Sequence, residues 1–149
     1  GDDDADLAPQ PQVTDLTALA ELTRRAGIPV DLEVDEAATG TSPIVQLTAF
    51  RVVQEALSNV VRHAPGAHTV VTVGIDGALL HLSVRNAHPR TSVARSGSVR
   101  PDIGGHGLRG MRERVDLLGG YLSAGPTADG GFAVNVTVPV TTHDQSVEP

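Results

Sequence analysis

The chain has 149 residues, a hydrophobic fraction of 40% and a mean hydropathy of −0.04, values typical of one soluble globular domain. Its formal net charge is −7, with the surplus of acids near the two ends, so the body lacks the clustered basic face that nucleic-acid binding requires. The absence of cysteine excludes disulfides and thiolate metal sites, and no apolar run is long enough to span a membrane. We therefore expect neither direct nucleic-acid binding nor membrane contact by this chain.

The chain is expected to open with a flexible lead or linker over residues 1–12, which are acidic and then proline-rich. A first helix is predicted from an N-cap at Thr14 or Asp15 to about Ala26, because a glycine and a proline follow. Residues 30–34 alternate apolar with acidic side chains, which predicts a strand with one buried face. The Thr-, Gly- and Ser-containing stretch after this strand is expected to be a loop.

The longest predicted helix has Ser42 as its N-cap, begins at Pro43 and includes the segment FRVVQEALSNVVRHA, residues 50–64. Its apolar residues form a wide stripe that is expected to face the core. On the other side, helical spacing brings carboxylate, carboxamide, guanidinium and imidazole groups toward the same space. These residues are Arg51, Glu55, Asn59, Arg62 and His63. Most such faces are only solvated, so a functional role depends on what the rest of the chain places beside this one.

A β-hairpin and a long loop are predicted next. Residues 69–75 and 79–85 are expected to be its two strands, joined by a tight turn at Asp76-Gly77. Residues 87–106 have no periodicity and are rich in Gly, Ser, Pro and Arg. Such a stretch is long for a connection in a compact domain, which favours either a functional loop or disorder.

The C-terminal part is predicted to hold a third helix over residues 108–118, ended by a glycine pair, and strands over residues 121–124 and 132–138. A frayed tail is expected over residues 141–149. Three helices and about five strands without regular βαβ alternation favour an α+β fold, a two-layer sandwich with the helices on one face of a mixed sheet. This domain is expected to occupy residues 13–140.

Two further features suggest a ligand site. The run Gly104-Gly105-His106-Gly107-Leu108 ends the long loop and starts the third helix. Glycines allow close approach of the backbone, and a helix N-terminus offers free N–H groups and a positive dipole end, which together suit a phosphate chain. Glycines before a helix often form only a turn, so this signal is weak alone. Asn86, just after the second hairpin strand, is either an acceptor for an adenine amino group or a plain turn residue.

The order and spacing of these segments resemble the ATP-binding catalytic domain of two-component sensor histidine kinases. The resemblance is to the NarL/DesK-like subfamily, whose kinases drive response regulators with a helix-turn-helix output, and it runs from about Leu16 to Val140. Its most specific stretches are FRVVQEALSNVVRHA, which matches the family's N box, and GGHGLRGMRERVDLLGG, which matches its second glycine box. The resemblance implies the Bergerat fold that gyrase, the large heat-shock ATPase chaperones and the mismatch-repair ATPases share.

In the N box the resemblance implies ligands for ATP and Mg²⁺. Asn59 would coordinate a Mg²⁺ ion that bridges the ATP phosphates, since a hard cation prefers oxygen ligands. Glu55 would be the catalytic residue, orienting or deprotonating the attacking group, or would hold a metal-bound water. Arg62 and His63 would contact the phosphates or the ribose.

In the second glycine box the resemblance implies a phosphate site. Gly105 and Gly107 would admit the phosphates to the N-terminus of the third helix. His106 would flank the nucleotide and Leu108 would close the pocket. Residues 87–104 would form the ATP lid.

The family's first glycine box usually reads Asp-x-Gly-x-Gly, whereas this chain has Asn86-Ala87-His88-Pro89-Arg90 at that place. The resemblance implies that the Asn86 side-chain oxygen accepts from the adenine amino group. The carboxylate charge is lost, and a hydrogen bond to a charged group is generally the stronger one.

The resemblance implies a kinase module that binds Mg·ATP and donates the γ-phosphoryl group to a histidine. That histidine would lie on a dimerisation and phosphoacceptor domain of a parent kinase. The parent kinase would then phosphorylate a response regulator. No helical hairpin with an acceptor histidine precedes residue 14, so that domain is expected to lie outside this chain, and self-phosphorylation is not expected. The expected location is the cytoplasm, with or without a membrane anchor in the parent. Three alternatives stay open: an anti-sigma-factor-type serine kinase, a non-catalytic nucleotide-binding or interaction module, and a structural domain without a ligand.

Overall fold

The computed structural model describes residues 10–88 and 106–140, in which five strands form one open sheet and three α-helices form a second layer. The strands are β1 (Val30–Val34), β2 (Thr69–Asp76), β3 (Leu79–Asn86), β4 (Tyr121–Pro126) and β5 (Phe132–Pro139). The helices are α2 (Leu16–Arg25), α3 (Pro43–His63) and α4 (His106–Leu117), with short 3-10 helices η1 (Val13–Asp15) and η2 (Glu36–Gly40). The predicted α+β sandwich is confirmed.

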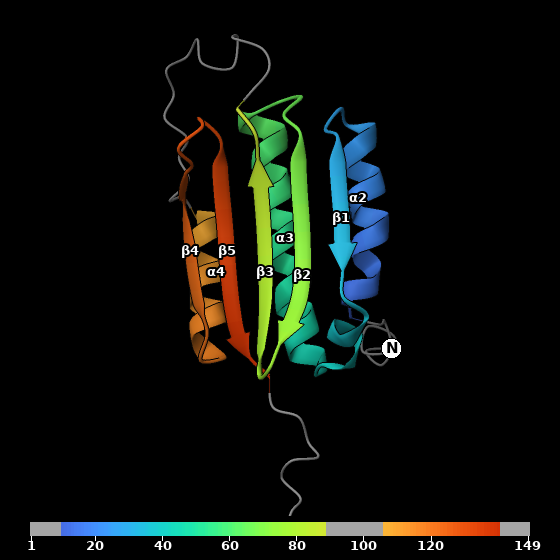
Figure 1. Ribbon diagram of the computed structural model, residues 1–149, viewed down its shortest axis with the longest axis vertical. Coiled ribbons are helices and arrows are strands. Elements are labelled where there is room, and N and C mark those ends of the chain that lie inside the picture. Colours follow the sequence, from blue (N-terminus) through green and yellow to red (C-terminus); the bar gives the residue numbers. More distant parts are fainter. Residues whose placement is uncertain (1–9, 89–105, 141–149) are drawn as a thin grey trace, which may run out of the picture.

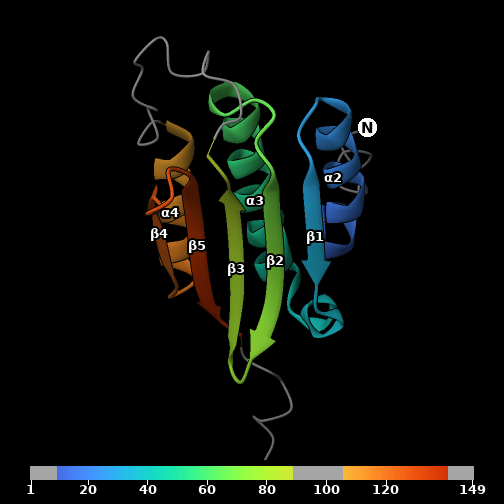
Figure 2. The ribbon, with the colours of Figure 1, turned by 45° about the horizontal axis from the view of Figure 1, so that its top comes forward.

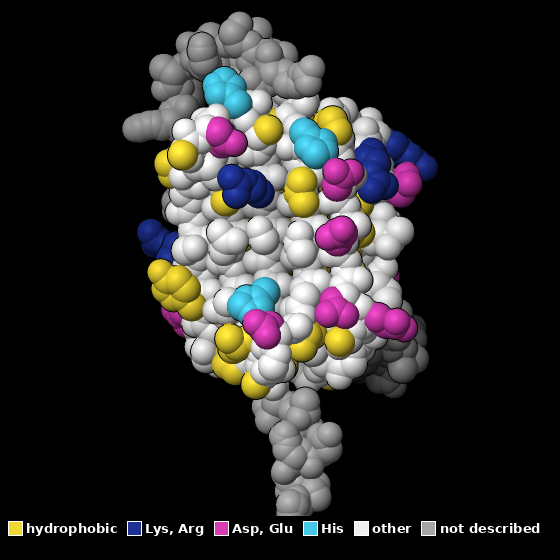
Figure 3. All heavy atoms as spheres, in the orientation of Figure 1, with side chains coloured by type: hydrophobic (Ala, Val, Ile, Leu, Met, Phe, Trp, Pro, Cys, Tyr) yellow, Lys and Arg dark blue, Asp and Glu magenta, His cyan; other side chains and the backbone are white. Residues whose placement is uncertain are grey.

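The strand order of the sheet is β1-β2-β3-β5-β4. β1 is parallel to β2 and the other neighbouring pairs are antiparallel, so the sheet is mixed, as predicted. All three α-helices cover the same face of it (Figures 1 and 2). Figure 3 shows the opposite face, which no described helix covers; charged, histidine and hydrophobic side chains are scattered over it. In the part of the chain that the structure describes, no helix has both the length and the apolar character needed to cross a membrane.

α3 begins where the sequence predicts, because its start signals are local. The Ser42 hydroxyl accepts a hydrogen bond from the Val45 N–H at 3.4 Å, and Pro43 takes the first helical position, where no N–H is needed. For α2 the predicted side-chain cap is wrong. Asp15 is the N-cap residue, but its carboxylate accepts the N–H of Gln12 at 2.8 Å instead of an N–H of α2.

The 3-10 helices η1 and η2 replace segments for which the sequence predicts a helix start and a loop. Both are held by Gln46 of α3, which is 6% exposed. Its side-chain oxygen accepts from the Val13 N–H at 3.1 Å, and its Nε2 donates to the carbonyls of Thr39 and Thr41 at 3.1 and 2.9 Å. One buried carboxamide therefore satisfies the backbone of both short helices.

The hairpin turn lies one residue later than predicted. Asp76 pairs with Leu79 across β2 and β3, so the two loop residues are Gly77 and Ala78. Gly77 has a φ of 63°, and a tight hairpin turn requires a positive φ at this position, which glycine adopts without strain. Both strands are one residue longer than predicted, and Asn86 is the last residue of β3 instead of the first residue after it.

The core lies between the sheet and the helices, and it is mostly aliphatic because the chain has few aromatic residues. The sheet contributes alternate residues, namely Val71, Val73, Leu80, Leu82, Val84, Leu122, Val134, Val136 and Val138. The helices contribute Leu16, Ala20, Val52, Val53, Ala56, Leu57, Val60, Met111 and Val115. The apolar stripe predicted for the longest helix, α3, therefore does face the core, and α2 and α4 also bury apolar residues there.

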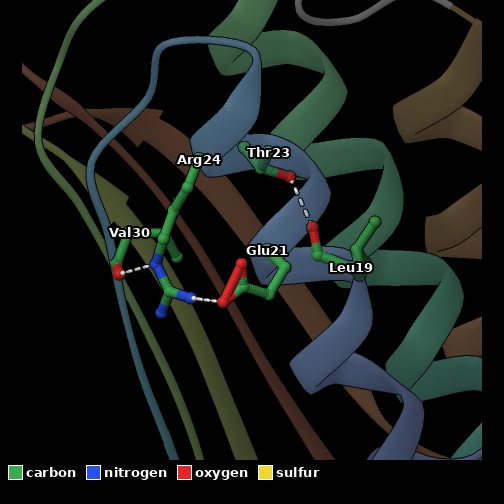
Figure 4. A network of polar contacts seen from close by, with 5 residues as sticks. All are labelled: Leu19, Glu21, Thr23, Arg24 and Val30. Carbon is green, nitrogen blue, oxygen red and sulfur yellow. Dashed lines mark hydrogen bonds and ion pairs between the residues drawn. The ribbon is translucent and has the colours of Figure 1, made fainter.

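Arg24 connects α2 to the edge strand β1 (Figure 4). Its Nε donates to the Val30 carbonyl at 3.0 Å and its Nη1 donates to the Glu21 carboxylate at 3.4 Å. The Thr23 hydroxyl donates to the Leu19 carbonyl at 2.8 Å within the helix. None of the candidate site residues takes part in these contacts, so α2 serves as scaffold at this edge.

Candidate functional site

A cavity of about 240 Å³ lies at the end of the sheet where α3 and β3 both terminate, the upper end in Figure 1. Its walls come from the last turns of α3, the end of β3, the start of β5 and the connection between β4 and β5. The lining residues are Ala56, Asn59, Val60, His63, Ala64, Val84, Asn86, Pro126, Gly130, Gly131, Phe132 and Val134. Most of them are apolar, and among the described residues the polar side chains in the lining are those of Asn59, His63 and Asn86.

Asn86 is buried in the wall of this cavity, with 7% of its surface exposed. It lies in the last residue pair of β3, between Thr69 of β2 and Phe132 of β5. Its Nδ2 donates to the Ala87 carbonyl at 3.0 Å, and no described residue donates to its Oδ1. A buried acceptor without a donor is destabilising, so this oxygen is suited to receive a hydrogen bond from a ligand.

The polar face of α3 comes together largely as the sequence predicts. Arg62 donates to the Asn59 Oδ1 at 2.6 Å and to the Ser58 hydroxyl at 2.8 Å, and its Nη2 lies 3.8 Å from the Glu55 Oε2. Asn59 and His63 line the cavity, whereas Glu55 and Arg62 lie beside it. Ser58 also belongs to this cluster, although it was not predicted as a site residue.

Arg51 does not join this cluster. Its Nη1 donates to the Gln54 side chain at 3.0 Å, and its guanidinium lies 6.0 Å from the Phe50 ring centroid. It belongs to an earlier turn of α3 and takes no part in lining the cavity.

The first turn of α4 packs directly on Glu55. A side chain added at Gly107 would overlap the Glu55 carboxylate, so this contact exists only because residue 107 is glycine. The contact brings the N-terminus of α4, whose first N–H groups have no partner within the helix, next to the polar face of α3. The second glycine box and the N box are therefore adjacent.

Leu108 is buried, but it does not line the cavity that contains Asn86. It lines an adjoining cavity of about 460 Å³, and the two cavities share Pro126 and Phe132. Of the other predicted residues in this box, Gly105 lies outside the described residues, as does the predicted lid beyond His88. His106 is the first residue of α4.

The connection between β4 and β5 rests on the end of β3. A side chain at Gly131 would overlap the Asn86 carbonyl oxygen. The Gly131 N–H donates to the Thr127 hydroxyl at 2.9 Å, and this hydroxyl donates to the Asp129 carboxylate. The Thr127 hydroxyl and the Gly131 N–H lower the pKa of Asp129. The sequence predicts no role for these residues, although the glycine pair before the last strand is typical of a close backbone contact.

Comparison with known proteins decides the family. The protein-family model named histidine kinase-, DNA gyrase B- and HSP90-like ATPase matches residues 44–142, which is more than half of the chain. The chain belongs to this family. The recognition predicted from the N box and the second glycine box is confirmed.

Two sensor histidine kinases of Bacillus subtilis (strain 168) are similar to this ATPase-family domain. YxjM is 30% identical over 132 residues, which cover 85% of this chain and 30% of that protein. LiaS is 32% identical over 115 residues, which cover 75% of this chain and 30% of that protein. The chain thus spans about 30% of the length of these curated relatives. The similarity to these kinases is consistent with the predicted NarL/DesK-like subfamily.

A solved structure supports the same architecture. The histidine kinase domain of the blue-light activated histidine kinase EL346 from Erythrobacter litoralis matches with a TM-score of 0.62 and 19% sequence identity. The match covers 83% of this chain and 57% of that one. At this identity the likeness shows a shared fold.

Proposed function

We propose that this domain binds Mg·ATP at the cavity and donates the γ-phosphoryl group to a histidine on a separate phosphoacceptor domain of a parent sensor kinase. The observation that carries the proposal is the meeting of three distant segments at one end of the sheet. Asn59 and His63 of the N box and Asn86 of β3 line one cavity, and the N-terminus of α4 adjoins it at Glu55. Use of cellular ATP and delivery to a response regulator would place this module in the cytoplasm.

The adenine base would occupy the mostly apolar cavity. A flat, largely apolar ring system suits the space between the aliphatic walls of α3, β3 and β5. The Asn86 Oδ1 would accept from the adenine amino group, because its Nδ2 is already bonded to the Ala87 carbonyl. One carboxamide would thus orient the base.

The phosphates would extend from the cavity toward α4. The N-terminus of α4 offers free N–H groups and a positive dipole end to an anion, and Gly107 leaves the backbone there without a side chain. Arg62, 54% exposed, is free to turn from Asn59 toward a more highly charged acceptor.

The residues fit a Mg²⁺ ion that is held mainly by the nucleotide. No group of three or more His, Cys, Asp or Glu side chains among the described residues could hold a metal alone. Asn59 and Glu55 lie one helical turn apart and present oxygen ligands, and Mg²⁺ commonly takes one or two protein ligands besides water and substrate phosphates. Bound there, the ion supplies charge neutralisation for the phosphates. Glu55, about one third exposed, would orient the incoming acceptor or a water.

Calorimetric titration of the purified chain with ATP, with and without Mg²⁺, tests this proposal. Saturable binding that depends on Mg²⁺ is expected, and Asn59→Ala should sharply weaken it while changing stability by about 0.5 kcal/mol or less, as is usual for surface polar residues. Gln54→Ala is the matched control, since Gln54 is exposed on α3 and does not line the cavity. Absence of ATP binding by the wild type, or equal affinity in the Asn59 variant, would contradict the assignment.

A further inference from the structure

We propose that Phe132 is a base-binding residue whose ring forms the wall against which the nucleobase stacks. The inference rests on the proposed nucleotide site and names a determinant of its affinity. Phe132 is the first residue of β5 and the direct partner of Asn86 in the antiparallel pair. Side chains of such a pair lie on the same face of the sheet, with Cβ atoms about 4.5–5.5 Å apart. The aromatic ring therefore begins beside the carboxamide that would orient the base.

The Phe132 ring borders open space on two sides. It lines both the 240 Å³ cavity and the adjoining 460 Å³ cavity, and it is only partly buried although it is apolar. A core residue of this size would normally be surrounded by other side chains. An aromatic ring that lines two adjoining cavities is suited to contact a ligand.

Two glycines, Gly130 and Gly131, precede Phe132 and carry no side chain. The His88 ring lies against Gly130, and the close approach of Gly131 to the Asn86 carbonyl fixes the start of β5. His63 lines the same cavity from α3, in the other layer. A flat ligand that enters between the layers would thus meet an aromatic ring from the sheet and an imidazole from the helix.

Phe132 and Asn86 would have different roles, one in the affinity for the nucleotide and the other in the selectivity between purine bases. Stacking on an aromatic ring is largely independent of the base, because every base has a π-face. A hydrogen bond to the Asn86 Oδ1 depends on a donor on the base, which adenine has and guanine lacks at that position. Phe132 would determine how tightly a purine nucleotide binds, and Asn86 would determine which purine is preferred.

The chain contains no tryptophan, so Phe132→Trp introduces one fluorophore at the proposed contact. Titration with Mg·ATP should change its emission saturably, because the base would cover the indole. Mg·tripolyphosphate, which has phosphates but no base, should leave the emission unchanged. Tyr121→Trp is the matched control, since Tyr121 is 66% exposed at the far end of β4 and should show no ATP-dependent change.

Calorimetry on Phe132→Leu and Phe132→Ala gives the second measurement. Loss of the ring should weaken ATP binding roughly tenfold to hundredfold in the alanine variant, and less in the leucine variant, while tripolyphosphate affinity stays unchanged. If Phe132→Trp binds ATP without a change in emission, or Phe132→Ala keeps wild-type affinity, the base does not stack here although ATP binding stands. If the wild type does not bind Mg·ATP, the proposed function fails and this inference falls with it.

Discussion

The amide nitrogen of Asn86 makes a hydrogen bond within the protein, whereas its amide oxygen is available to a ligand. Its Nδ2 donates to the Ala87 carbonyl at 3.0 Å, whereas its Oδ1 has no donor among the described residues. A carboxylate in the same place would set an oxygen against the Ala87 carbonyl with no hydrogen between them. The carboxamide thus fixes its own orientation and still offers an acceptor to the cavity.

Substitutions at Asn86 separate the contact of its nitrogen with the Ala87 carbonyl from the proposed contact of its oxygen with the base. Asn86→Ala should weaken ATP binding roughly tenfold to hundredfold, because the adenine amino group would lack an acceptor in a partly dry cavity. Asn86→Asp keeps the acceptor, so ATP affinity should remain close to that of the wild type. Its melting temperature should fall, because the Ala87 carbonyl loses its donor. Calorimetry and thermal unfolding of the three proteins measure both effects.

GTP provides the control for this series. It carries a carbonyl where ATP has the amino group, so the wild type should prefer ATP, and Asn86→Ala should bind the two nucleotides more nearly equally. Equal ATP affinity in all three proteins would mean that Asn86 does not contact the base.

At the scale of elements, the contact between α3 and α4 determines whether the two boxes form one site. Gly107 lies against the Glu55 carboxylate with no room for a side chain. Three residues further along α4, a side chain added at Gly110 would meet nothing within 4 Å. Substitution of glycine by alanine is therefore expected to have opposite effects on stability at Gly107 and at Gly110.

Gly107→Ala should displace the first turn of α4 from Glu55, lowering stability by about 1–3 kcal/mol, as overpacking usually does, and weakening ATP binding. Gly110→Ala should be stabilising by about 1 kcal/mol, because alanine favours a helix over glycine. Thermal unfolding and calorimetry of both variants measure this. Adding Glu55→Ala to Gly107→Ala should restore stability by removing the overlapping carboxylate. A Gly107→Ala variant as stable as Gly110→Ala would show that the α3–α4 contact is not close.

Elements were predictable from the sequence where their signals are local. α3 starts as predicted because Ser42 and Pro43 act within one turn, and the strands follow from alternation of apolar residues. η1 and η2 were not predictable, since both depend on the buried side chain of Gln46. One of its partners, Val13, is 33 residues away in the sequence, and no local pattern encodes that contact.

At the scale of the whole molecule, the site likewise combines residues that local sequence patterns predict with residues that only distant contacts bring together. Glu55, Asn59, Arg62 and His63 could be grouped from the sequence because they share one helix, and their clustering follows from helical spacing. Phe132 could not, because its position beside Asn86 depends on β3 pairing with β5. The predicted count of strands did not determine their order in the sheet, which is set by pairing between distant segments.

Two histidines, His68 and His81, lie on the side of the sheet opposite the cavity. His81 follows the buried Leu80 on β3 and therefore points to the uncovered face. His68 contacts Asp31 of β1, with 3.0 Å between the His68 Nε2 and the carboxylate, and Asp31 is likewise exposed beside a buried neighbour. His63 lines the proposed base cavity. His68 and His81 thus lie on the side of the sheet opposite the proposed nucleotide site, and His63 is assigned to the base.

The purified chain incubated with labelled ATP and Mg²⁺ should remain unlabelled on histidine, because phosphoryl transfer requires the acceptor nitrogen in line with the γ-phosphate and the proposed acceptor belongs to a separate domain. Addition of a phosphoacceptor domain of the parent kinase as a separate protein should produce label on that domain, lost in acid and retained in base, as expected for phosphohistidine. A variant of the acceptor domain without its histidine is the control. Stoichiometric self-labelling of the chain on histidine would contradict the need for a separate acceptor. Acid-stable label on a serine of another protein would instead favour the serine-kinase alternative, because a phosphoserine ester survives acid.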